Sequence, residues 1–132
     1  MRYLSLVLAM IMVLMISCKK NSVPVTIPHG TYQGTFQRSV VNETSNVTLK
    51  FSSNNFEGQS QYIHYPDICN GVFIISQDTI SFQNACVYTA DFDWSYILQG
   101  KFKISIFEDS VIMTRSNNGP VPYHDTYKLK KE

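Results

Sequence analysis

The stretch CNGVFIISQDTISFQNAC, residues 69–86, decides the fold, because it reads as two short strands joined by one tight turn. Apolar and β-branched residues fill both halves, and the polar pair at residues 77–78 lies at the centre, where a turn is expected. Pairing outward from this turn brings the two cysteines opposite each other. The predicted register pairs Ser76 with Thr79, Ile75 with Ile80, Phe73 with Phe82, Gly71 with Asn84, and Cys69 with Cys86.

This register predicts a disulfide between Cys69 and Cys86. Directly opposed residues of an antiparallel pair have Cβ atoms about 4.5–5.5 Å apart, close to the separation that a disulfide needs. A structural zinc site needs two more thiolate or imidazole ligands at suitable spacing, and no Cys-x-x-Cys redox motif is present. A bridge that closes a loop of this length stabilises the fold by about 3 kcal/mol in the chain-entropy model.

Further strand-like segments lie on both sides of the hairpin and predict an all-β domain. Lys101 and Lys103, for example, alternate with Phe102 and Ile104, as expected for a strand with one buried face. The expected strands are residues 31–38, 46–52, 55–62, 71–76, 79–84, 95–107, 110–116 and 123–130. Eight consecutive strands joined by short turns favour a single eight-stranded antiparallel up-and-down barrel, with a two-sheet β-sandwich as the alternative.

The N-terminus predicts export and a lipid anchor. Arg2 precedes a short apolar run at residues 4–16, too short for a membrane span of about 20 residues and typical of a signal peptide. The following MISC resembles the bacterial lipobox, in which the cysteine is lipidated and becomes the first mature residue. We therefore expect a lipoprotein signal peptide at residues 1–17, a lipidated Cys18 with a flexible tether at 18–29, and the barrel domain at 30–132. An ordinary signal peptide is the alternative.

Charge and composition exclude some function classes. Once Arg2 leaves with the signal peptide, basic and acidic residues are equal in number, so no basic excess indicates nucleic acid. Asp91 and Asp93 flank Phe92. Because aspartate is common in turns, we interpret this segment as a turn, in which Trp94 plugs one end of the barrel. His29, His64 and His124 are scattered, and no phosphate-binding or nucleophile motif is present. We expect neither an enzyme nor a cofactor or metal site.

Several longer stretches resemble a known family. GTYQGTF in the first strand, ICNGVFIISQDTISFQNAC, ADFDWSYILQGKF and the closing DTYKLKK are similar to small lipocalin-like lipoproteins of Bacteroidota. The resemblance implies a calycin-type barrel with a lipid anchor on the bacterial envelope. Lys19 and Lys20, in place of an acidic surface-export signal, favour the outer membrane facing the periplasm. DTI and DSV resemble an O-glycosylation motif of exported proteins of this group, on Thr79 or Ser110, although Asp and Ser are also expected in turns.

Two function classes remain open. The first is a monomeric binding module that holds a small apolar or amphipathic ligand at one open end of the barrel, as aromatic walls often do. The lining residues expected for it are Tyr62, Tyr88, Phe92 and Trp94. The second is a protein-interaction module for an envelope partner, such as a lysozyme or protease inhibitor. Four small residues are expected on inward faces: Gly34, Gly58, Ser60 and Gly100. Such residues either leave a cavity inside the barrel or only relieve crowding between strands.

Overall fold

Strands form where apolar and polar side chains alternate, because alternate residues then point into one shared core. The structure, a computed structural model, describes residues 25–132, so Cys18 and the predicted signal peptide lie outside the described residues. The strands are β1 Gly30–Arg38, β2 Thr44–Ser52, β3 Asn55–Ser60, β4 Asn70–Ser76, β5 Thr79–Asn84, β6 Gly100–Phe107, β7 Ser110–Asn117 and β8 Tyr123–Lys131. One 3-10 turn, η2 Trp94–Tyr96, lies between β5 and β6.

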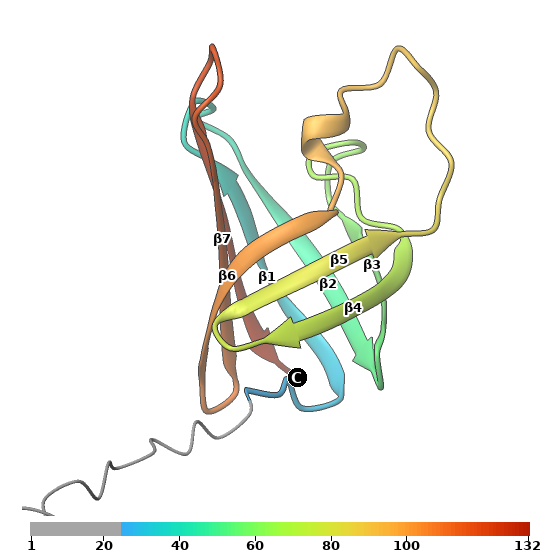
Figure 1. Cartoon of the computed structure of the whole chain (residues 1–132), viewed down its shortest axis with the longest axis vertical. Helices are drawn as coiled ribbons and strands as arrows, with labels where there is room; N and C mark the ends of the chain where they lie inside the picture. The colour runs from blue at the N-terminus through green and yellow to red at the C-terminus, as the bar shows by residue number, and fades with distance from the viewer. Residues whose placement is uncertain (1–24) are drawn as a thin grey trace, which may run out of the picture.

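The eight strands pair antiparallel in sequence order, and β8 closes the barrel by pairing with β1 (Figure 1). The predicted eight-stranded up-and-down barrel is therefore confirmed, and the β-sandwich alternative is excluded. Closure leaves no long free strand edge, which removes the usual risk of edge-to-edge association. The weakest seam lies between β3 and β4, which share only the pairs from Asn55↔Val72 to Glu57↔Asn70.

The β4–β5 hairpin has the predicted register. Ser76 pairs with Thr79, Phe73 with Phe82 and Gly71 with Asn84, around a turn at residues 77–78. The cysteines lie just beyond the last pair of this ladder, and the predicted Cys69–Cys86 disulfide is present, with 6.4 Å between its Cα atoms. The disulfide thus continues the hairpin past its last hydrogen-bonded pair.

The prediction of one long strand at residues 95–107 was wrong for its first five residues, 95–99. β6 begins only at Gly100, which has a positive φ of 80°. Before it, the chain makes the 3-10 turn η2 and then buries Ile97 and Leu98 completely. Their apolar character suited a strand, but in the structure Leu98 joins the barrel core and Ile97 is buried outside the strands.

The barrel interior is occupied by the protein's own aromatic side chains. Edge-to-face pairs join Tyr32 to Phe51, at 5.5 Å between ring centroids, and Phe51 to Phe73, at 5.2 Å. Further ring contacts extend this network through Phe56, Phe82, Phe102, Tyr127, Phe36 and Tyr65. These rings span the barrel, so its centre is a packed core.

The small inward-facing residues allow strands to approach closely. A Cβ atom on Gly34 of β1 would lie 1.8 Å from the Lys128 carbonyl oxygen of β8. On Gly58 of β3 it would lie 2.3 Å from the Thr48 carbonyl oxygen of β2. Of the two roles considered, relief of crowding applies to Gly34 and Gly58, whereas Gly100 is exposed and has no atom near its Cβ position, so its expected inward orientation was wrong.

Candidate functional site

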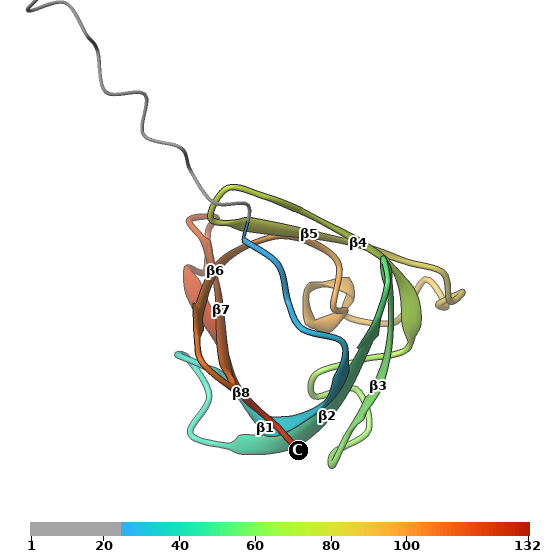
Figure 2. The ribbon, with the colours of Figure 1, turned by 90° about the horizontal axis from the view of Figure 1, so that it is seen from below.

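The two ends of the barrel differ in their connections (Figure 1). At the turn end, two-residue turns join β2 to β3, β4 to β5 and β6 to β7, and the chain enters at residue 25. Figure 2 shows this entering segment crossing the barrel mouth, where Ile27 joins the core and the Tyr32 hydroxyl donates to the Pro28 carbonyl at 2.8 Å. The opposite, loop end carries the connections at residues 39–43, 61–69, 85–99 and 118–122, and is the candidate site.

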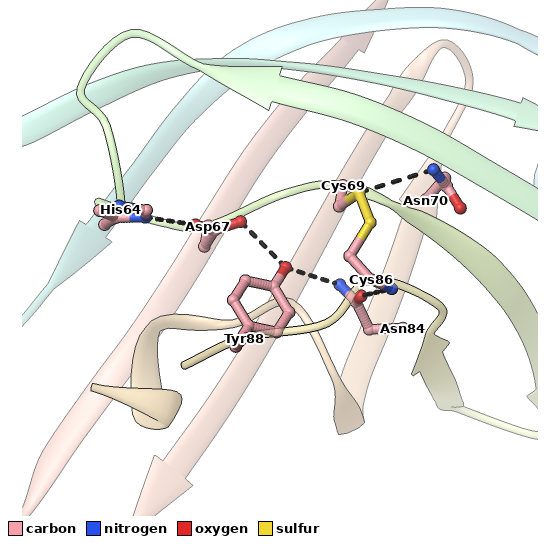
Figure 3. Close-up of a disulfide and its surroundings, with 7 residues drawn as sticks. All are labelled: His64, Asp67, Cys69, Asn70, Asn84, Cys86 and Tyr88. Carbon is pink, nitrogen blue, oxygen red and sulfur yellow. Dashed lines mark hydrogen bonds and ion pairs between the residues drawn. A yellow bond between two sulfur atoms is a disulfide. The ribbon is translucent and has the colours of Figure 1, made fainter. Parts of the chain in front are cut away.

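The disulfide ties two of these loops together and begins a chain of polar contacts (Figure 3). The Asn84 side chain accepts from the Cys86 amide at 2.7 Å and donates to the Tyr88 hydroxyl at 3.3 Å. Tyr88 in turn donates to Asp67 at 3.0 Å. Burial and the hydrogen bond to this carboxylate raise the pKa of Tyr88 to about 12, so its hydroxyl is protonated at neutral pH.

His64 completes this polar chain, with its Nδ1 atom 2.5 Å from the second Asp67 oxygen. The 61–69 loop exposes His64, which has a positive φ of 64°. A carboxylate-oriented imidazole next to a tyrosine is a familiar element of acid–base sites. Such a pair is catalytic only when a substrate and a reacting group lie beside it. Among residues 25–132, we identify no side chain that acts as the reacting group.

Three of the four predicted ligand-binding residues come together. Tyr88 lies against Phe92, with ring centroids 5.2 Å apart, and against Trp94 at 6.1 Å. His64 contacts Phe92 edge-on at 4.6 Å. We call Tyr88, Phe92 and Trp94 the aromatic cluster.

Tyr62 lies on the neighbouring 61–69 loop, where it pairs with Tyr65, and no ring contact joins it to the cluster. The expectation that Trp94 plugs the barrel was wrong. Trp94 is 49% exposed, and its indole nitrogen donates to the Thr89 carbonyl at 3.3 Å. Leu98, which follows it in the same segment, belongs to the barrel core instead.

A buried ionic cluster lies beneath these loops, and the sequence analysis did not identify it. Asp125 of β8 is fully buried and accepts from Arg38 at 2.7 and 2.9 Å and from Arg115 at 2.7 Å. The Arg38 guanidinium also donates to the Ser95 side chain and carbonyl, both at 2.8 Å. Arg115 donates to the same Ser95 carbonyl and to the Gln99 carbonyl. The two arginines therefore hold the η2 segment onto the barrel.

Arg38 is further enclosed by aromatic rings. Its guanidinium carbon lies 3.9 Å from the Tyr96 ring centroid and 3.8 Å from that of Tyr123. Burial alone lowers the pKa of Arg38, but the hydrogen bond and charge of Asp125 outweigh burial and raise it. The Arg115 Nε atom is buried without a hydrogen-bond partner among the described residues. The charged groups of this cluster are paired with one another and largely buried, so they are poorly accessible to a ligand.

Hydrogen bonds join three of the four loops, at residues 39–43, 61–69 and 85–99, to one another. The 39–43 loop accepts from Tyr65 at the Glu43 carbonyl, at 2.8 Å, and the Ser39 amide donates to the His124 carbonyl at 2.9 Å. Backbone bonds at 3.0 and 2.9 Å join Asp67 to Tyr96 and Leu98. A surface connected in this way keeps its shape before any partner arrives.

Three hollows on the protein surface are lined by residues outside the aromatic cluster. One of about 590 Å³ follows the outer face of β1, β2 and β3, lined by polar side chains such as Gln33, Thr48 and Gln59. Two others lie beside the β3–β4 seam, around Cys69 and around Val72. The cluster itself is a partly exposed surface on the 85–99 loop, so a ligand there lies against it and not inside the barrel.

Residues 25–132 contain neither a candidate metal centre nor a candidate membrane-spanning helix. Within that part, no three histidine, cysteine or carboxylate side chains lie together as metal ligands. No helix there is long and apolar enough to cross a membrane. Comparison of the chain with protein-family models, curated proteins and solved structures finds no match.

Proposed function

We propose that this protein is a lipid-anchored, lipocalin-like binding module of the bacterial envelope, and not an enzyme. Cys18 carries the acyl chains and holds the protein on the outer membrane, facing the periplasm. The described chain enters at residue 25 on the turn end, so an anchor at Cys18 leaves the loop end free to bind. Support for the anchor comes from the apolar run that ends at Ser17 and from the family resemblance.

Metabolic labelling with a fatty-acid analogue tests the anchor. The wild-type protein is expected to take up the label and to fractionate with membranes. Cys18→Ala removes the acceptor thiol, so label in that variant equal to the wild type contradicts the proposal. Cys69→Ala is the matched control, because it removes a cysteine that lies far from the lipobox.

We further propose that the ligand is a small apolar or amphipathic molecule and that it lies against the aromatic cluster. One observation carries this: Tyr88, Phe92 and Trp94 gather on a loop that hydrogen bonds hold in place, and Trp94 remains half exposed. An exposed, pre-ordered set of aromatic faces binds apolar groups at low entropic cost. The packed core favours this outer location over the interior of the barrel.

Trp94 makes the proposal measurable, because it is the only tryptophan. Binding beside it is expected to change the wavelength or intensity of its emission in a saturable way. Fatty acids, sterols, alkylammonium salts and short alkanols provide a suitable first panel. Tyr88→Ala should weaken binding, whereas Tyr123→Ala, which changes a tyrosine elsewhere on the loop end, tests whether the effect is specific to the cluster. Unchanged emission across the whole panel contradicts ligand binding at this place.

A second candidate is a protein-interaction module, and a different observation favours it. Each of the four loops exposes at least one large apolar side chain: Val40, Ile63, Val87 with Trp94, and Val121. Exposed apolar groups on a connected surface are typical of protein-binding sites. Inhibition assays with a lysozyme and with secreted proteases test this candidate. Loss of inhibition in Ile63→Ser and in Val121→Ser, from different loops, would assign it to the loop end.

A further inference from the structure

Charge is distributed unevenly between the loops and the strands. The four loops contain the carboxylates Glu43, Asp67, Asp91 and Asp93, one histidine, His64, and no lysine or arginine. Within residues 25–132 every lysine lies in a strand: Lys50 in β2, Lys101 and Lys103 in β6, and Lys128, Lys130 and Lys131 in β8. A ligand that approaches the loop end therefore meets acidic groups first.

The positive groups near the loops are already bound to protein partners. Arg38 is almost completely buried between two tyrosine rings, and both it and Arg115 donate to Asp125. His64, which contacts Phe92 of the cluster, is paired with Asp67. The arginine donors are engaged with these partners or, in the case of the Arg115 Nε atom, buried without one, and the exposed edge of the His64 ring is the remaining donor beside the cluster.

Carboxylates alternate with two rings of the aromatic cluster along the chain, in the order Asp91, Phe92, Asp93 and Trp94. Asp91 and Asp93 are exposed and directly flank Phe92, and Asp93 also accepts from the Ser95 amide at 3.0 Å as the N-cap of η2. The bond from the Trp94 indole to Thr89 orients this half-exposed ring. Aromatic faces attract cations through their quadrupole, and nearby carboxylates add to that attraction.

We propose that the aromatic cluster selects ligands with a positively charged head group, held by Trp94 and Phe92 with Asp91 and Asp93. This inference rests on the proposed function and adds to it the charge of the ligand. Alkylammonium and quaternary ammonium compounds fit the site. Fatty acids of similar size do not, because their carboxylate meets acidic side chains and no free arginine or lysine. The apolar part of the ligand lies along the exposed ring surfaces.

A matched series of three ligands tests this selectivity. Hexyltrimethylammonium, hexanol and heptanoate share a similar apolar chain and differ in the charge of the head group. Each is titrated against the protein as recovered from cells, in zwitterionic-lipid nanodiscs if it carries its anchor, with empty nanodiscs subtracted. Calorimetry and Trp94 emission report binding. The cation is expected to bind about fivefold or more tighter than hexanol, and heptanoate more weakly than both.

Paired variants identify the groups responsible. Asp91→Asn with Asp93→Asn removes two charges and keeps an N-cap at position 93, since asparagine also caps helices. The preference for the cation over hexanol is expected to fall to about half of its wild-type value or less in this variant, since only the cation–π attraction then remains. Glu108→Gln with Asp109→Asn removes two exposed charges at the turn end and should leave the preference unchanged.

The outcomes separate the two proposals. Failure of all three ligands to bind contradicts the proposed function itself. Binding in which heptanoate equals or exceeds the cation leaves the ligand site standing and overturns the inference about charge. Retention of the full preference in the Asp91 and Asp93 double variant also overturns it.

Discussion

The turn end and the loop end close the same barrel by different means. At the turn end, each two-residue turn contains a non-glycine residue with positive φ: Ser53 at 53°, Gln77 at 55° and Glu108 at 50°. These turns depend on a few neighbouring residues. At the loop end, the connections are held by the disulfide, the Arg38–Asp125–Arg115 cluster and bonds between loops. Local backbone preference shapes one end, and contacts between distant residues shape the other.

The largest expected effect comes from removing the charge that holds the loop end. Asp125→Asn leaves Arg38 and Arg115 without their shared carboxylate in a buried place, which should destabilise the protein by about 3–5 kcal/mol. Glu57→Gln is the matched control at an exposed ion pair with Lys50, where about 0–1 kcal/mol is expected. Denaturant unfolding measures both. A loss below that of the control variant would show that the cluster does not stabilise the loop end.

The disulfide should have the next largest effect. Replacing Cys69 and Cys86 by serine removes the link between the 61–69 and 85–99 loops and should cost about 3 kcal/mol. The barrel itself should still fold, since the cysteines lie outside the β4–β5 ladder. Far-ultraviolet circular dichroism and denaturant unfolding check the two parts. Unfolding of the whole barrel in this variant would contradict a local role for the disulfide.

Two isoleucines compare the ends directly. Ile27 at the turn end is 5% exposed and belongs to the core, so Ile27→Ala should cost about 2 kcal/mol or more. Ile63 at the loop end is 85% exposed, so Ile63→Ala should change stability by less than about 0.5 kcal/mol. Thermal or chemical unfolding distinguishes these values. Similar losses of stability in Ile27→Ala and Ile63→Ala would mean that the two ends do not differ in how they bury apolar side chains.

Substitution of Tyr88 should have the smallest effect on stability, and this effect should depend on pH. Tyr88→Phe removes the hydrogen bond to Asp67 and should cost about 1 kcal/mol at neutral pH. The fold raises the pKa of Tyr88 to about 12, from 10.0. Between these values the unfolded tyrosine loses its proton while the folded one keeps it, so stability falls as pH rises through this window.

Phenolate absorbance measures the titration of Tyr88. Comparison of the wild type with Tyr88→Phe distinguishes this titration from those of the other tyrosines. The wild type should show a group titrating near pH 12 that Tyr88→Phe lacks. Asp67→Asn should shift this group towards lower pH, since the Asp67 carboxylate contributes to the raised pKa. Tyr62→Phe is the control, because it alters an exposed tyrosine that makes no ring contact with the cluster. A Tyr62→Phe variant that loses the same titration would contradict the assignment.

The contrast between local preference and contacts of distant residues also explains which features the sequence could predict. Alternating side chains and turn residues act between neighbours, so the strands, the β4–β5 register and the Cys69–Cys86 disulfide were predictable. The ionic cluster was not, because Arg38 and Asp125 are far apart in the chain and meet only when β8 pairs with β1.

Residues 95–99 show the limit of local pattern. Their apolar side chains suit a strand or a buried loop segment equally, and long-range packing of Ile97 and Leu98 decides between them. The gathering of Tyr88, Phe92 and Trp94 was predictable from their closeness in sequence. The separate position of Tyr62 was not, because it depends on how the 61–69 loop folds against its neighbours.

The central claim is that binding occurs at the loop end while the barrel interior stays packed, and one measurement tests it most directly. Trp94 is the only tryptophan and lies in the aromatic cluster, whereas Met113 is fully buried and the only methionine among the described residues. Selective isotope labelling of the Trp94 indole and the Met113 methyl group places one NMR probe at each location. On titration with hexyltrimethylammonium, the account predicts a saturable shift of the Trp94 resonance and an unchanged Met113 methyl resonance. A saturable Met113 shift with an unmoved Trp94 would place the ligand inside the barrel and contradict the account.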